Sequence, residues 1–204
     1  GKPTVIYETN AGRPGSYRGE YPLMLAAFAS WQDWDAIFFH YWAGAADGIP
    51  DEQYLLMPLP PPTVEHYWSA VQHHSDPVMC AAMAIAGRLF LHGSLHRAPT
   101  PAVYEAGSGA IFSYDFQNGI GMRDDAFTRG SMLRFTPEKK ESVLPEKGQP
   151  AQNAVASGDE IFWDWPNGRL IIDAPAFKAY VGRTAEAYRF KYGTALSDVS
   201  TPWV

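Results

Sequence analysis

Apolar residues follow one rhythm in the first half of the chain and another in the second. An apolar run at residues 4–7 precedes a segment at 20–31, where apolar side chains recur every three or four positions, and a second apolar run lies at 36–42. Short β-branched and aromatic runs are typical of buried strands, and the longer spacing is typical of a helix. The pattern therefore predicts a strand, a helix and a second strand.

A strand, a helix and a strand at this spacing predict a βαβ unit, with parallel strands and a right-handed crossover. A long polar and proline-rich segment follows at about residues 44–74. Asp76 and Pro77 then have the chemistry of a helix start, because Asp is a favoured N-cap and Pro fits the first helical position. We expect the next helix over residues 78–92.

From residue 99 onward the pattern becomes that of a β-rich region, with short apolar runs separated by Gly, Asn, Asp and Pro. Asn167-Gly168 lies between two apolar runs and predicts the turn of a β-hairpin. The chain therefore divides into an α/β part at residues 1–98 and a β-rich, sandwich-like part at residues 99–204. The strands expected in the second part lie at 102–105, 110–114, 132–135 and 160–165.

Composition excludes several classes of function. The chain is 46% hydrophobic and 19% charged over 204 residues, as folded proteins are. Its net charge of −6 argues against a nucleic-acid partner, because the chain lacks the positive charge needed to neutralise a row of phosphates. No apolar stretch reaches about 18 residues, so we expect no membrane span. The single Cys80 excludes an internal disulfide, and the six His residues lack metal-ligand spacing, so we expect no metal and no cofactor.

Aromatic residues make up 14% of the chain, including seven Trp and eleven Tyr. An aromatic ring can stack on the apolar face of a sugar ring whose hydroxyl groups are satisfied around the edge. The same side chains also fill protein cores, and composition alone favours that simpler interpretation.

Glu8 is the sharpest candidate for chemistry, because it ends the first expected strand. In barrels of parallel strands the active site lies at the C-terminal ends of the strands. A carboxylate at such a position can act as a nucleophile or as an acid/base. The alternative is a structural glutamate that pairs with Arg13 or Arg18 and holds the loop.

The end of the second expected strand adds His40, Tyr41 and Trp42. A Trp beside a carboxylate at a barrel mouth is suited to stack on a sugar. The alternative is that Phe38, His40 and Trp42 point towards helices on the outside of a barrel. Tyr17 is a further candidate substrate contact, as is Arg18, although the same residues can serve the start of the helix instead.

Residues 2–8, with Lys2, Pro3 and Glu8, resemble the Lys-Pro-x-x-x-x-Glu ending of the seventh strand in the large clan of retaining (β/α)8-barrel glycoside hydrolases. This clan includes many β-galactosidases, cellulases and mannanases. Residues 36–42 are similar to its eighth strand. Segments at 17–20, 34–35, 76–92 and 162–182 resemble a bacterial branch of the clan in which the barrel leads into a β-domain.

This resemblance implies an α/β plus β fold, in which the last βαβα units of a (β/α)8 barrel precede a β-rich domain. It implies that Glu8 is the nucleophile in the cleavage of O-glycosidic bonds, and that Trp42 forms the floor of a sugar subsite in an oligo- or polysaccharide site. The acid/base glutamate of the clan follows the fourth strand in an Asn-Glu pair, and this chain has no Asn-Glu dipeptide. We therefore expect the acid/base upstream of the chain.

A barrel cannot close from these elements, so we expect the chain to be a piece of a longer protein and to be inactive alone. Its exposed strand edges predict homo-oligomers. The chain carries no targeting signal, and a bacterial secreted or periplasmic parent is compatible with the resemblance. Two other classes stay open, a non-catalytic carbohydrate-binding or interaction module and a purely structural domain.

Overall fold

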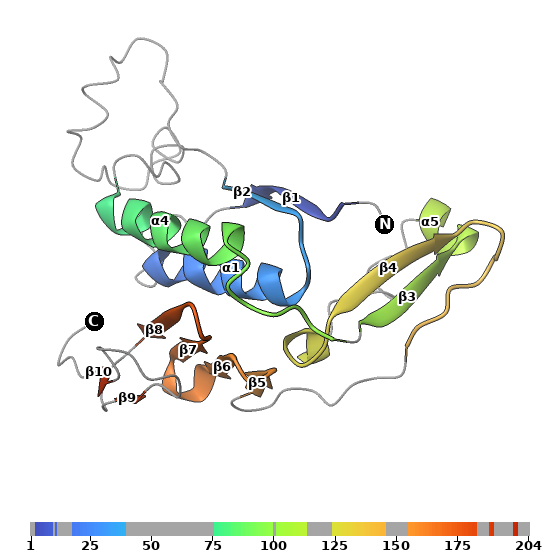
Figure 1. Cartoon of the computed structure of the whole chain (residues 1–204). Helices are drawn as coiled ribbons and strands as arrows, with labels where there is room; N and C mark the ends of the chain where they lie inside the picture. The colour runs from blue at the N-terminus through green and yellow to red at the C-terminus, as the bar shows by residue number, and fades with distance from the viewer. Residues whose placement is uncertain are drawn as a thin grey trace, which may run out of the picture. The chain divides into compact units, whose positions relative to one another are not determined.

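The computed structural model describes residues 3–9, 11, 18–39, 76–99, 101–113, 124–145, 155–182, 188–189 and 198–199 (Figure 1). The chain divides into two compact units. The first unit comprises Gly1–Ala29 and Trp34–Ser94, and the second comprises Ser30–Asp33 and Leu95–Val204. Each unit is described below by itself.

The first unit contains the expected βαβ arrangement. Strand β1 (Val5–Thr9) pairs in parallel with β2 (Ala36–Phe39), and the connection between them includes the 3-10 helix η1 (Arg18–Glu20) and helix α1 (Tyr21–Trp31). The predicted strands, helix and parallel pairing are thus confirmed. Helix α4 (Pro77–Leu91) lies on the same side of the two strands as α1 (Figure 1).

The predicted start of α4 at Asp76 is confirmed. The carboxylate of Asp76 accepts hydrogen bonds from the backbone N–H groups of Val78 and Met79, at 3.1 Å and 3.2 Å. These bonds satisfy two of the N–H groups that a helix leaves unpaired in its first turn. Pro77 occupies the first turn, where its missing N–H costs nothing.

The second unit is built on a four-stranded antiparallel sheet in the order β5 (Val155–Ser157), β6 (Ile161–Asp164), β7 (Arg169–Asp173) and β8 (Lys178–Gly182). The expected hairpin joins β6 to β7 through η4 (Trp165–Asn167) and Gly168, whose φ of 62° is left-handed. The sheet buries the core side chains Ile161, Trp163, Leu170, Ile171 and Ile172.

The second unit also contains a parallel pair, β3 (Ala102–Gly107) and β4 (Ser131–Thr136), and a short antiparallel pair, β9 (Tyr188–Arg189) and β10 (Asp198–Val199). The 3-10 helix η3 (Asp124–Phe127) precedes β4. The described sheets are two-, two-, two- and four-stranded. The barrel and the sandwich-like domain stay predictions.

The strand predicted at residues 110–114 is wrong, because helix α5 (Ser108–Ser113) covers most of that segment. A short apolar run does not distinguish a strand from a buried helix. Hydrogen bonds to the loop at Lys139 and Lys140 favour the helix over the strand here. The N–H groups of Ser108 and Gly109 donate to the carbonyls of Lys139 and Lys140, at 2.7 Å and 3.0 Å, and so satisfy the first turn of the helix.

Candidate functional site

Strand β1 contains one extra residue between Ile6 and Thr9, in the stretch that includes Glu8. Its pairing with β2 joins Ile6 to Ile37 and then Thr9 to Phe39. The chain thus advances three residues along β1 while it advances two along β2. Such a β-bulge commonly lies beside a functional site, where it changes the direction of a side chain.

The bulge changes the face on which Glu8 lies. In a regular strand, residues two apart share a face, so Ile6 and Glu8 would point to the same side. The extra residue instead returns Thr9 to the side of Ile6 and leaves Tyr7 and Glu8 on the other side. Exposure agrees with this arrangement, because Ile6 and Thr9 are half-buried whereas Glu8 is exposed and Tyr7 is 80% exposed.

The two faces of the β1–β2 pair therefore differ in character. The helix face consists of Ile6, Thr9, Ile37 and Phe39, and its Phe39 packs against Tyr21 of α1, with ring centroids 6.3 Å apart and planes at 87°. The open face consists of Val5, Tyr7, Glu8 and Phe38, all exposed.

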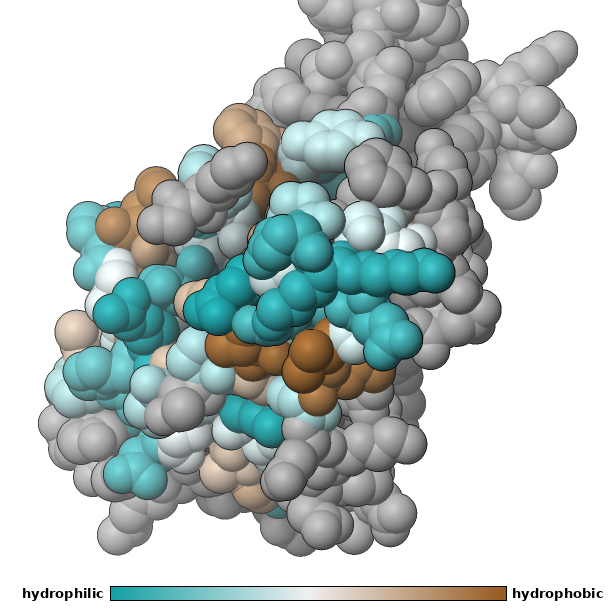
Figure 2. All heavy atoms as spheres, turned by 90° about the vertical axis from the view of Figure 1, so that its right-hand side faces the viewer, coloured by the Kyte–Doolittle hydropathy of each residue, from teal (hydrophilic) through white to brown (hydrophobic). Residues whose placement is uncertain are grey.

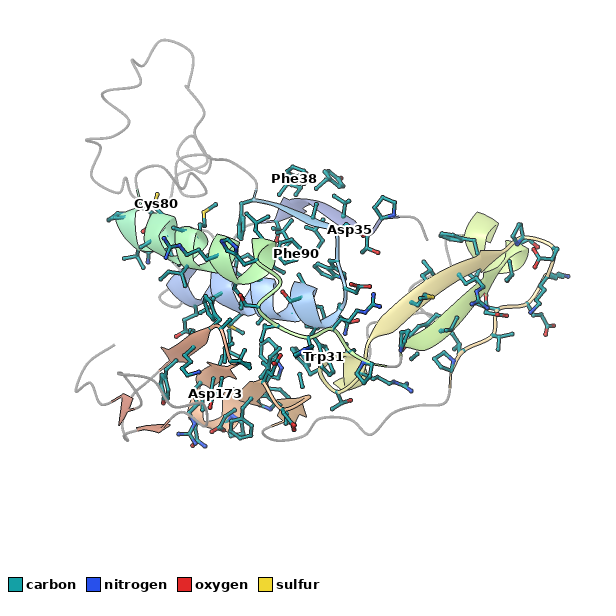
Figure 3. The ribbon with its side chains drawn as sticks, in the orientation of Figure 1. Trp31, Asp35, Phe38, Cys80, Phe90 and Asp173 are labelled. Carbon is teal, nitrogen blue, oxygen red and sulfur yellow. The ribbon has the colours of Figure 1, made fainter. Side chains whose placement is uncertain are left out.

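Phe38 is 57% exposed, and Figure 3 shows it on the opposite side of the strands from Phe90 of α4. Of the alternative in which Phe38, His40 and Trp42 point towards helices, only the part on Phe38 falls on described residues, and that part is wrong.

Arg18 is engaged with the start of α4. Its Nε donates to Oδ2 of Asp76 at 2.5 Å, and Asp76 is only 2% exposed. Gly19 fits closely in the same place, because a Cβ on it would lie 2.7 Å from Cγ1 of Val78. Arg18 thus fastens η1 to α4, and its assignment as a substrate contact stays a prediction.

The other predicted site residues, His40, Tyr41, Trp42 and Tyr17, lie outside the described residues, as does Arg13. Sequence reasoning missed Thr9 and Tyr21, whose hydroxyl groups are hydrogen-bonded to each other beside Glu8. No motif marks either residue. Thr9 is the neighbour of Glu8 in the sequence, and only the hydrogen bond between Thr9 and Tyr21 shows that Tyr21 lies close to this strand end.

Carboxylates of the second unit serve the fold. Asp164 accepts from Nδ2 of Asn167 at 2.9 Å and from Nε of Arg169 at 2.5 Å. Burial alone would raise the pKa of Asp164, but the bonds from Asn167 and Arg169 outweigh burial and lower it. Glu160 accepts from the backbone N–H of His96 at 2.8 Å. Carboxylates bound in this way stabilise a hairpin and a loop.

The exposed face of β3 and β4 is a second surface of mixed character. Glu105 pairs with Arg134 and Lys139, at 3.2 Å and 2.8 Å, and the bond from Lys139 is the main cause that lowers the pKa of Glu105. Met132 is exposed on the same face as Arg134, and Phe135 is exposed on the opposite face of the strand pair. Figure 2 shows an apolar patch directly below a band of hydrophilic side chains on the face that it displays.

Within the described part of the chain, no group of three or more His, Cys, Asp or Glu side chains is placed to hold a metal ion. No helix in that part has the length and apolar character needed to cross a membrane. Comparison of the chain with protein-family models, with curated proteins and with solved structures found no match.

Proposed function

We propose that the chain is the C-terminal part of a retaining glycoside hydrolase and that Glu8 is its catalytic nucleophile. The observation that carries the proposal is the bulge in β1, which directs Glu8 to the open face at the C-terminal end of a parallel strand. In a (β/α)8 barrel the helices cover the outside of the strands, and the active site lies at their C-terminal ends. The face opposite the helices is therefore the face that a barrel would enclose.

The proposed reaction proceeds by double displacement. The carboxylate of Glu8 attacks the anomeric carbon of the sugar, the bond to the leaving oxygen breaks, and the acid/base group gives that oxygen a proton. Water then attacks the glycosyl ester, the same group takes a proton from the water, and Glu8 leaves as a carboxylate. The second carboxyl group must lie about 5 Å away, and we assign it to a segment upstream of this chain.

We assign sugar contacts to the residues that follow Phe39 in the sequence, namely His40, Tyr41 and Trp42. Trp42 offers an apolar ring on which the C–H face of a sugar stacks. Tyr17 is a further assigned contact, and Arg18 would act there only with the part of its guanidinium group that Asp76 leaves exposed. The substrate in this proposal is an oligo- or polysaccharide, and the 204-residue chain alone is inactive.

The test compares Glu8→Gln with the unchanged full-length protein that contains this chain. The substrates are 2,4-dinitrophenyl β-glycosides of galactose, glucose and mannose, whose leaving group needs little help from a general acid. We expect kcat to fall by on the order of 10⁴-fold, because the amide of Gln is a poor nucleophile. Glu138→Gln removes an exposed carboxylate of the second unit and should keep the kcat of the unchanged protein.

A chemical label identifies the nucleophile directly, whereas a substitution shows only a loss of activity. A 2-deoxy-2-fluoro glycoside with the same leaving group forms a long-lived ester with the nucleophile of a retaining enzyme. Mass spectrometry of the digested protein should find the added sugar on the peptide that contains Glu8. Turnover that survives in Glu8→Gln, or a label on another residue, would remove the nucleophile assignment.

A second candidate function is a non-catalytic carbohydrate-binding module. It is favoured by the two exposed aromatic side chains of the open face, Tyr7 and Phe38, because exposed rings are the usual platforms for sugars. Calorimetric titration of the 204-residue chain with cello-, manno- and galacto-oligosaccharides separates the two functions. Binding by the chain alone, without cleavage by the full-length protein, would support the module.

A further inference from the structure

Tyr21 contacts the C-terminal ends of both parallel strands. Its hydroxyl group is hydrogen-bonded to Oγ1 of Thr9, the last residue of β1. Its ring packs edge-on against Phe39, the last residue of β2. Thr9 and Phe39 are themselves paired across the two strands, so the three side chains form one cluster on the helix face.

This cluster adjoins the bulge. Thr9 is the first paired residue after the bulge, and its return to the helix face leaves Glu8 on the open face. A bond from Thr9 to the first residue of α1 opposes a slip of β1 by one residue, because such a slip would turn Thr9 away from Tyr21. The hydroxyl pair therefore favours the register in which Glu8 is directed away from the helices.

We infer that Tyr21 is a positioning residue for the proposed glycosidase, acting through Thr9 to hold Glu8 in the direction that attack on the sugar requires. The inference rests on the proposed function. Tyr21 lies on the helix face and does not touch the substrate in this scheme, so its effect is on the orientation of the nucleophile. A displacement of about 1 Å at a reacting group can lower a rate by about 100-fold.

The edge-on contact between Tyr21 and Phe39 acts on the other strand. Phe39 is the last residue of β2, so the ring of Tyr21 anchors the C-terminal end of that strand. The ring of Tyr21 and its hydroxyl group thus have separate tasks. The ring fixes the end of β2, and the hydroxyl fixes the end of β1.

The experiment removes each hydroxyl group while it keeps the rest of the side chain. Tyr21→Phe, Thr9→Val and the double variant are made in the full-length protein and assayed with the 2,4-dinitrophenyl glycosides. We expect each single variant to lower kcat by about 10- to 100-fold with little change in KM, and the double variant to lower it no further, because the two groups act through one bond. Thr9→Ser, which keeps the hydroxyl, should retain most of kcat.

Two controls separate positioning from a loss of folded protein. Thr4→Val removes a hydroxyl group of the same chemistry just before β1, at its other end, and should leave kcat unchanged. The amount of 2-fluoro sugar bound at completion counts the competent sites, so kcat is expressed per labelled site. A purely structural role for Tyr21 would reduce the number of labelled sites and not the rate at each site.

The outcomes are distinct for the inference and for the function on which it rests. An inactive Glu8→Gln with full kcat per site in Tyr21→Phe or Thr9→Val would overturn the positioning role alone. Effects of the two single variants that multiply in the double variant would also overturn it, because independent groups do not share one bond. A fully active Glu8→Gln would overturn the proposed function and the inference together.

Discussion

The β1–β2 pair and the β5–β8 sheet are both built from apolar strands, but only the second contains fully buried apolar side chains. Ile172 of β7 is fully buried, with Ile171 and Leu170 beside it. On β1 and β2, by contrast, Val5, Tyr7 and Phe38 are exposed on the open face. Antiparallel strands are joined by short hairpins, and their sheet can bury one face while the other stays in water. Parallel strands occur almost only in sheets that are covered on both faces.

The two regions also use carboxylates in opposite ways. Asp164 lies at the end of a strand, is 2% exposed and accepts three side-chain hydrogen bonds that close its hairpin. Glu8 lies near the end of a strand too, but a bulge directs it to an exposed face. The contrast teaches that two carboxylates near strand ends can differ in exposure, because a local turn encloses Asp164 whereas the register shift in β1 leaves Glu8 on an exposed face.

The largest effect is expected in the core of the β5–β8 sheet. Ile172→Ala leaves a cavity at a side chain with 0% exposure, and we expect it to lower the free energy of unfolding by about 3 kcal/mol. Ile172→Val, which removes a single methyl group, should cost about 1 kcal/mol. Amide hydrogen exchange in β6 and β7 measures both. Equal costs for the two variants would show that this sheet is not close-packed.

A smaller effect is expected at Asp164. Asp164→Asn removes the charge that Arg169 faces, and we expect a loss of about 2 kcal/mol in the free energy of unfolding. The lowered pKa of Asp164 means that this stabilisation is present above the unfolded pKa of about 3.9 and is lost as pH falls through the lower folded value.

Urea midpoints measured between neutral and strongly acidic pH test the sign of this dependence. The unchanged chain should lose stability over the acidic range that Asp164 titrates, and Asp164→Asn should lose less. Glu138→Gln, at an exposed position, is the matched control and should follow the unchanged chain. If all three proteins lost the same stability at acidic pH, Asp164 would not be the cause of that loss.

The smallest effect on the 204-residue chain is expected on the open face. Phe38→Ala should change the free energy of unfolding of the 204-residue chain by less than about 0.5 kcal/mol, because the ring is already exposed. If the chain is part of a longer protein whose barrel encloses this face, as proposed, the same substitution in that protein should cost about 3 kcal/mol or more. Thermal denaturation of both proteins makes the comparison, and an equally small cost in each would contradict the enclosed face.

The expected homo-oligomers stay a prediction, which light scattering of the chain addresses.

Local sequence chemistry predicted much of the element pattern. Asp76 and Pro77 specify the start of α4, and Asn167-Gly168 specifies the turn between β6 and β7. These features were predictable because each depends on a side chain and the backbone within a few residues of it. The segment at 110–114 was mispredicted, because the bonds that favour α5 come from Lys139 and Lys140, which lie far along the chain.

The sequence by itself determined that an apolar strand runs up to about Glu8, that a helix follows, and that a second parallel strand completes the unit. Tertiary structure alone decided the face on which Glu8 lies, because strict alternation places it with Ile6 on the helix side and the bulge reverses that placement. It also decided that Tyr21 and Thr9 meet beside the bulge. The physical reason is that strand register depends on pairing between residues about thirty positions apart, which no local pattern of the chain specifies.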